Sequence, residues 1–290
     1  MFTKGLALNT TSLPILSTNY STDRNLIIES ESCGVVGEPK IYGGLYTTNG
    51  QFSAAYRPQL FNPIIEGGLL GKLGGGIGET FAFYDVSTGD EFGKVWTFAS
   101  CALTSCEISM RVRNFAQITF DWIGTYKKPL AHVLSTPDHS SSIPIFYNAS
   151  IAGVKCQGIT IKITRPLGND DHILGSEYTQ SIYQNDNLSI EGTIQLSNRE
   201  YTMLDDLLTT GDEASWNNDD PKSNLVDLGE LSIVMHSPDG YQRLTTITIP
   251  HVNAVSGNVS VEGASRFEKT IQWRATTSDL DAIVFGAASE

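Results

Sequence analysis

The chain has 290 residues, of which 40% are hydrophobic and 18% charged, a composition typical of a soluble globular protein with length for one large or two medium domains. Its formal net charge is −13, and residues 146–290 hold 20 Asp and Glu against 9 Lys and Arg. This balance argues against a protein that grips nucleic acid through a basic face. No apolar run approaches the roughly 20 residues of a membrane helix. The four scattered cysteines form no CxxC pair, which indicates a reduced, cytoplasmically made protein.

The N-terminal part of the chain predicts extended structure. Residues 6–23 are rich in Thr, Ser and Asn and indicate an arm or edge strand. Residues 40–53 alternate weakly and contain Asn49-Gly50, a dipeptide that favours a two-residue hairpin turn. A short helix is expected over residues 57–65, where Pro58 and Pro63 limit its length.

A glycine-rich stretch, Gly67 to Gly78, follows this helix. A phosphate-binding P-loop requires Gly, four residues and then Gly-Lys-Ser/Thr. Here Leu73 follows Gly71-Lys72, and Glu66 occupies the position of the first glycine. The stretch therefore predicts a flexible surface loop. Beyond it, strands are expected over residues 81–86 and 95–103, with a turn at residues 87–89.

The second half predicts strands over residues 158–164 and 187–196, followed by a helix over residues 198–209. Asn198 is suited to cap that helix, and Tyr201, Leu204, Leu207 and Leu208 follow at helical spacing. Strands over 231–236 and 241–249 are expected to form a hairpin around Pro238-Asp239-Gly240.

Two long alternating stretches relate the halves of the chain. Val259 to Thr276 alternates apolar and polar residues with a bulge or bend expected at Gly263, and Ile108 to Thr125 has the same character. Trp122 and Trp273 match at an offset of 151 residues. Further matches pair residues 44–48 with 192–196 and residues 94–103 with 243–252. The sequence thus predicts two copies of one β-rich module.

This pattern resembles the tail tube proteins of tailed bacteriophages. The resemblance rests on NLSIEGTIQLSNREYTMLDDLL at 187–208 and VSVEGASRFEKTIQWRAT at 259–276, and it covers most of the chain as a pattern. In that family each module is a β-sandwich flanked by a helix, and long strands of several copies line the channel of a ring. The rings stack into the tube through which the genome leaves. Members with one module form hexamers, and members with two form trimers with pseudo-sixfold symmetry.

The resemblance implies a mainly β fold with two tandem β-sandwich or barrel modules, each with one short helix, whose long strands form a ring-wide inner β-barrel on oligomerisation. The modules are expected at residues 1–128 and 146–290, with a linker at 129–145. The implied function is a structural virion protein that forms the stacked rings of a tail tube, the channel for DNA ejection. Implied partners are other copies, as homotrimeric or alternatively homohexameric rings, with tail sheath, terminator or baseplate proteins also possible. DNA is expected to pass without specific binding, and the protein to assemble in the host cytoplasm into the virion tail.

No catalytic, cofactor-binding or metal-binding residues are predicted. Period two assigns Phe120, Trp122, Phe267, Ile271 and Trp273 to the core. The opposite set is expected to line a net acidic channel that repels phosphates. These channel candidates are Arg113, Gln117, Thr119, Asp121, Glu191, Glu262, Glu268, Thr270 and Gln272.

Two other functions fit the same composition. A β-sandwich glycoside hydrolase would use two carboxylates about 5–10 Å apart, for which Glu191 and Glu262 are the candidates. A carbohydrate-binding or adhesin-type sandwich would stack sugars on aromatic side chains. Its candidates are Tyr42, Tyr46, Trp96, Trp122, Trp216 and Trp273.

Overall fold

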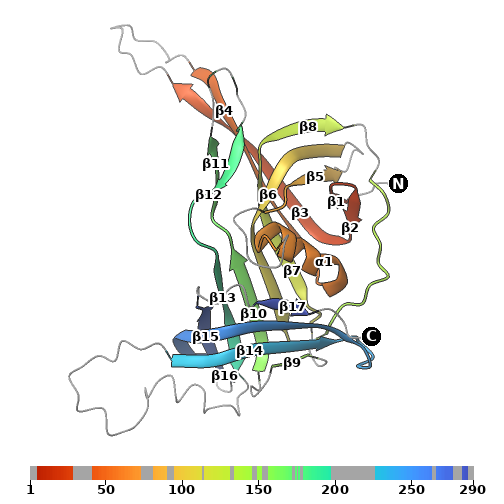
Figure 1. Cartoon of the computed structure of the whole chain (residues 1–290), viewed down its shortest axis with the longest axis vertical. Coiled ribbons are helices and arrows are strands. Elements are labelled where there is room, and N and C mark those ends of the chain that lie inside the picture. Colours follow the sequence, from red (N-terminus) through yellow and green to blue (C-terminus); the bar gives the residue numbers. More distant parts are fainter. Residues whose placement is uncertain are drawn as a thin grey trace, which may run out of the picture.

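In the part of the chain that it describes, the computed structural model is mainly β, with a large antiparallel sheet and one short α-helix (Figure 1). It describes residues 5–28, 41–72, 81–89, 95–112, 114–130, 134–145, 149–151, 156–171, 174, 176, 179–196, 226–262, 266–276 and 283–286. The predicted helix over 198–209 lies outside these residues. Within them, no helix is long and apolar enough to cross a membrane.

The elements of the first half run from β1 to β8. Their bounds are β1 Leu6–Leu8, β2 Thr11–Leu13, β3 Ile15–Ile28, β4 Ile41–Ala55, α1 Pro58–Ile64, the π-helix η1 Ile65–Leu69, β5 Tyr84–Gly89, β6 Val95–Arg111, β7 Gln117–Gly124 and β8 Tyr126–Leu130. Strands β3, β4, β7 and β6 are neighbours in that order. The N-terminal part of β6 also pairs with β5 and β8, and β5 pairs with β1.

The second half repeats this pairing scheme. Its strands are β9 Ala149–Ile151, β10 Cys156–Thr164, β11 Leu167–Asp171, β12 Ser181–Gln184, β13 Ser189–Leu196, β14 Val226–His236, β15 Arg243–Glu262, β16 Arg266–Ala275 and β17 Val284–Gly286. Here β10, β13, β16 and β15 are neighbours, β15 also pairs with β14 and β17, and β14 pairs with β9. Each half therefore contains the same arrangement of strands in the same chain order.

The equivalence of the halves extends to single residues. Trp122 lies opposite Gly50 across β7 and β4, and Trp273 lies opposite Gly192 across β16 and β13. A Cβ on either glycine would approach the indole to 2.4 Å at Gly50 and 2.6 Å at Gly192, so each tryptophan occupies space that a side chain would fill.

The long strands β6 and β15 also share their irregularities. Ser100 and His251, 151 residues apart, both have a φ of 49°. Four residues later, Thr104 and Val255 are each skipped in the pairing with the next strand. Two bulges at identical positions bend each strand from one set of partners to another.

A single row of eight strands joins the halves, because β6 pairs with β10 (Figure 1). The order is β3, β4, β7, β6, β10, β13, β16, β15, with every neighbour antiparallel. We call these eight strands the wall. One face of the wall packs on the apolar core, where Phe120, Trp122, Ile271 and Trp273 are at most 1% exposed, as predicted. The side chain of Phe267 is not described.

The helix covers the core face of the wall. Helix α1 begins at Pro58 and contains Pro63, as expected, and its Phe61 ring lies 5.9 Å from that of Phe120. The chain continues as η1, in which Leu69 is buried, as is Leu70 after it. The prediction of a flexible surface loop is therefore wrong for residues 67–70, because their leucines fill the core.

Other local predictions are wrong for a common reason, the lack of any signal for pairing direction. Val259 to Thr276 contains two antiparallel strands, with Glu262 opposite Arg266, and Ile108 to Thr125 contains the end of β6 and all of β7. Asn49-Gly50 lies inside β4 and forms no hairpin turn, and residues 87–89 belong to β5. The turn at Pro238-Asp239-Gly240 is confirmed by the Gly240 N–H donating to the Ser237 carbonyl at 2.8 Å.

Candidate functional site

The polar face of the wall gathers the predicted channel residues whose side chains are described. Gln117, Thr119 and Asp121 lie on β7, Glu191 on β13, and Thr270 and Gln272 on β16. Each alternates with buried residues of its own strand, so all six point away from the core. Arg113 lies outside the described residues. Glu262 and Glu268 lie in β15 and β16, opposite Arg266 and Ser260, but their side chains are not described.

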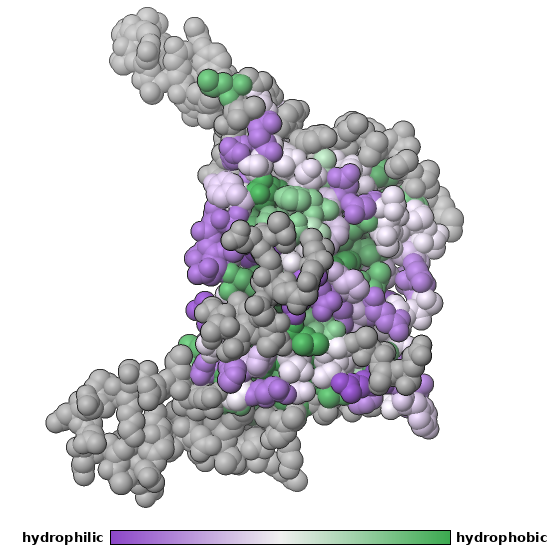
Figure 2. Space-filling view, viewed as in Figure 1, coloured by the Kyte–Doolittle hydropathy of each residue, from purple (hydrophilic) through white to green (hydrophobic). Residues whose placement is uncertain are grey.

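Hydrogen bonds cross between strands on this face. Gln51 Nε2 donates to Asp121 Oδ1 at 2.8 Å, and Ser105 Oγ donates to Asp121 Oδ2 at 2.5 Å. The hydroxyls of Thr160 and Thr193 are 2.8 Å apart. Further along, Ser256 Oγ donates to Gln272 Oε1 at 2.9 Å. The face is thus a polar surface that runs through both halves. In the view of Figure 2, hydrophilic residues lie along the left side of the molecule.

The pairing of β6 with β10 joins the two halves, and we call it the joint. A row of alternating charge crosses this joint. Glu107 lies opposite Lys162, Lys162 opposite Glu191, and Glu191 opposite Arg274. Neighbours of opposite sign in register favour strand pairing. These four residues line a shallow cavity of about 390 Å³.

The sequence did not predict the cationic members of this row. Lys162 and Arg274 alternate correctly within their own strands, but nothing in the sequence says which residues lie beside them. Together with Arg111 they nearly balance the four acids described on the face, Asp23, Glu107, Asp121 and Glu191. The described side chains of the wall therefore carry charges of both signs, with four acids against three cations, and the expectation of a net acidic channel stays a prediction.

The two residues considered for glycoside hydrolysis, Glu191 and Glu262, lie far apart along the strands. The row of Glu191 reaches β15 at Asn253, and Glu262 follows nine residues later on that strand. At about 3.3 Å per residue the separation along β15 is roughly 30 Å, whereas the paired carboxylates of glycosidases lie about 5–10 Å apart. These two residues do not form such a pair.

The rings of Trp122 and Trp273 in the wall are buried and are not accessible to ligands. Trp122 and Trp273 are both 1% exposed, so neither presents a ring for sugar stacking. Neither indole Nε1 has a hydrogen-bond partner among the described residues. Their common role is to fill the core against Gly50 and Gly192.

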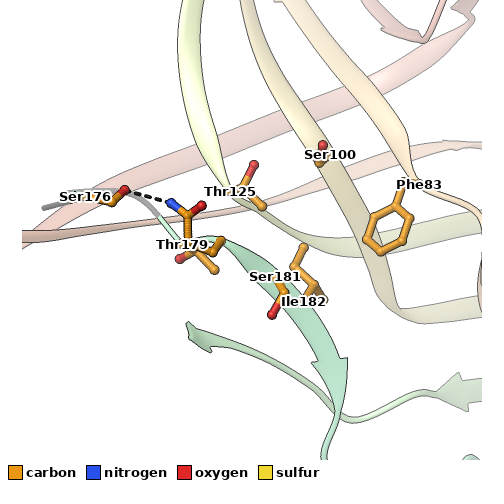
Figure 3. Close-up of a pocket in the computed structure, with 8 residues that line it drawn as sticks. Phe83, Ser100, Thr125, Ser176, Thr179, Ser181 and Ile182 are labelled. Carbon is orange, nitrogen blue, oxygen red and sulfur yellow. Dashed lines mark hydrogen bonds between the residues drawn. The ribbon is translucent and has the colours of Figure 1, made fainter. Parts of the chain in front are cut away.

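A second cavity, of about 560 Å³, lies between strands of the first half and the segment that enters β12 (Figure 3). Its described lining consists of one aromatic ring, one aliphatic side chain, hydroxyls and an amide. These residues are Phe83, Ser100, Thr125, Ser176, Thr179, Gln180, Ser181 and Ile182. Gln180 Nε2 donates to Ser176 Oγ at 2.8 Å. No described residue of the lining titrates near neutral pH, so they supply no general acid or base.

The remaining candidate site is a pair of strand edges. Within the described chain, β3 pairs on one side only, with β4, and residues 256–262 of β15 pair on one side only, with β16. Their counterparts β10 and β6 pair with each other and form the joint. The two ends of the wall thus carry the same two kinds of edge that are already joined in its middle.

No protein-family model matches the chain, and a search of curated proteins finds no match. The wall and its edges are therefore the structural features from which a function can be inferred.

Proposed function

We propose that this chain is a ring-forming structural protein of the tail-tube type, in which β3 of one copy pairs with β15 of the next. The observation that carries the proposal is the joint between β6 and β10. Because the halves repeat the same strand arrangement, each chain has at its ends the two edges that this joint brings together. Long edges with open hydrogen-bonding groups are a hazard for a free chain, and closure into a ring removes them.

The strand directions support closure. All neighbours in the wall are antiparallel, and an even number of strands places β3 of the next copy antiparallel to β15. Three chains with eight wall strands each would form a barrel of 24 strands. At a spacing of about 4.8 Å and a tilt of about 40°, that barrel is roughly 48 Å across, wide enough for a DNA duplex with water. A trimer with two equivalent modules per chain is therefore the proposed ring.

The polar face supports passage of DNA in preference to its capture. With its polar residues toward the lumen, the wall presents hydroxyls, amides and charges of both signs. Its described side chains include no run of Lys and Arg of the kind that releases counterions from phosphates and drives DNA binding. We propose that rings stack into the tube of a virion tail, with the two modules as tail-tube modules and with sheath, terminator or baseplate proteins as further partners.

The joint also fixes the expected register between copies. Thr164 lies opposite Ser105 at the joint. Their counterparts, placed through the pairing of each strand with its neighbours, are Asp23 in β3 and Ser256 in β15. These two positions are exposed and lie at opposite ends of the wall. Seven strand spacings of about 4.8 Å separate them by roughly 34 Å within one chain, so a bond between them must join two chains.

The test is a cysteine pair, Asp23→Cys with Ser256→Cys, oxidised after assembly. The expected result is a covalent ladder that ends at the trimer on a non-reducing gel. A matched control combines Ser17→Cys with Ser256→Cys; Ser17 is exposed on the same strand but six residues out of register, so this pair is expected not to cross-link. Single-cysteine variants measure any background from native thiols. A chain that stays monomeric at high concentration, with neither pair cross-linked, would contradict the proposal.

A further inference from the structure

The side chain of Arg165, from the second half, is buried against residues of the first half, next to the pairing of β10 with β6. The Arg165 N–H donates to the Thr104 carbonyl of β6 at 2.8 Å, immediately beyond the last register pair of β10 and β6. Its side chain is only 2% exposed. Nη1 donates to the carbonyl of Leu69 at 2.7 Å, and the guanidinium carbon lies 4.8 Å from the centre of the Phe81 ring.

The chemistry of these partners explains how a charge is accommodated there. Leu69 is the last residue of η1, and carbonyls at a helix C-terminus carry partial negative charge and accept hydrogen bonds from cations. Nε of Arg165 donates to Gln184 Oε1 at 3.0 Å. A buried guanidinium with these contacts fixes the position of β10 on β6, because removing it would leave a cavity and unsatisfied acceptors.

The repeat places Arg24 at the corresponding position of β3. Tyr20 lies opposite Gly50 as Ile161 lies opposite the equivalent Gly192, which sets an offset of 141 residues between β3 and β10. Arg24 is therefore the counterpart of Arg165. It is exposed, and its guanidinium carbon lies 4.8 Å from the centre of the Tyr46 ring. The counterpart of Thr104 is Val255, the skipped residue of the β15 bulge, which is 54% exposed.

We propose that Arg24 is the positioning residue of the contact between copies: its N–H donates to the Val255 carbonyl of the neighbouring chain, and its guanidinium becomes buried at that contact. This inference rests on the proposed ring and adds the residue that sets its register. An arginine N–H then donates to the carbonyl of the skipped residue twice, once within the chain through Arg165 and once between chains through Arg24.

The test compares Arg24→Gln with Arg111→Gln, a matched loss of one exposed arginine on the polar face of β6. Assembly is followed by sedimentation velocity over a concentration series. We expect Arg24→Gln to raise the dissociation constant of the ring at least tenfold, or about 1.4 kcal/mol, and to leave the melting temperature of the single chain unchanged. Arg111→Gln is expected to shift the dissociation constant less than twofold. Arg165→Gln is expected to lower the melting temperature of the single chain.

A second measurement needs no variant. Arginine-directed labelling of the wild-type chain, read by mass spectrometry, is expected to modify Arg24 before assembly and to spare it in rings, while Arg111 stays reactive in both. Rings in which Arg24 stays fully reactive, or an Arg24→Gln chain that assembles like the wild type, would overturn the inference and leave the ring standing. A wild-type chain that forms no ring would instead contradict the proposed function.

Discussion

Replacing Trp273 by alanine is the sharpest test of how the wall is oriented. The side chain is 1% exposed, and its indole fills the space beside Gly192. A buried tryptophan removes roughly 150–250 Å² from water, worth about 4–6 kcal/mol at about 25 cal/mol per Å². Because its Nε1 has no hydrogen-bond partner among the described residues, replacing Trp273 by alanine breaks no hydrogen bond to those residues. We expect a loss of about 3–5 kcal/mol in the free energy of unfolding, within the range for large aromatic truncations.

The adjacent residue Gln272 provides the control. It points to the polar face and is exposed, and its only described side-chain contact is the hydrogen bond accepted from Ser256. Gln272→Ala should cost about 1 kcal/mol or less. Urea unfolding, followed by circular dichroism at a concentration low enough to prevent assembly, measures both variants, since association would stabilise the folded chain by mass action. Equal and small effects of the two substitutions would refute the assignment of faces.

Two further predictions concern the core of the first half. Gly50→Ala would place a Cβ 2.4 Å from Trp122 Cζ2 and 2.8 Å from the Asn19 carbonyl oxygen. We therefore expect this substitution to lower the free energy of unfolding by about 1–3 kcal/mol, measured by urea unfolding. An unchanged unfolding midpoint would show that the contact is not tight. Burial raises the pKa of the Cys101 and Cys106 thiols, which keeps both protonated in the folded chain while their unfolded counterparts ionise near pH 8.5. The contribution of the two buried thiols to the free energy of unfolding is fully present below that pH. It falls as the pH rises, by about 1.4 kcal/mol per thiol at pH 9.5. A Cys101→Ala, Cys106→Ala variant should lose this slope, and a slope that survives in the variant would assign it to other groups.

The duplication could be predicted from the sequence because one large residue marks it. Trp122 and Trp273 are 151 residues apart in the sequence, and the skipped residues of the two bulges, Thr104 and Val255, are separated by the same number of residues in the structure. The match of residues 44–48 with 192–196 is wrong by six residues, since Gly50 is the counterpart of Gly192. Sequence alone could not identify the correct glycine, because what defines it is the indole on the next strand.

Pairing direction and lateral neighbours could not be predicted from the sequence. Period-two alternation keeps the same phase from Val259 and Val261 in β15 to Phe267 in β16, so two paired strands and one long strand give the same pattern. Alternation correctly placed Asp121 and Gln272 on the polar face. The charge row from Glu107 to Arg274 depends on the register of four strands, which tertiary packing decides.

The most direct test of the ring is electron microscopy of the purified protein, combined with measurement of its mass in solution. We predict rings of three chains, or tubes stacked from such rings, in which the β3 and β15 edges of neighbouring chains merge into one continuous barrel around a channel roughly 48 Å across at the strand backbone. Rings of six chains would contradict the trimer and leave a tube function standing. Monomers that persist at high concentration after long incubation would contradict the proposal that this chain forms rings.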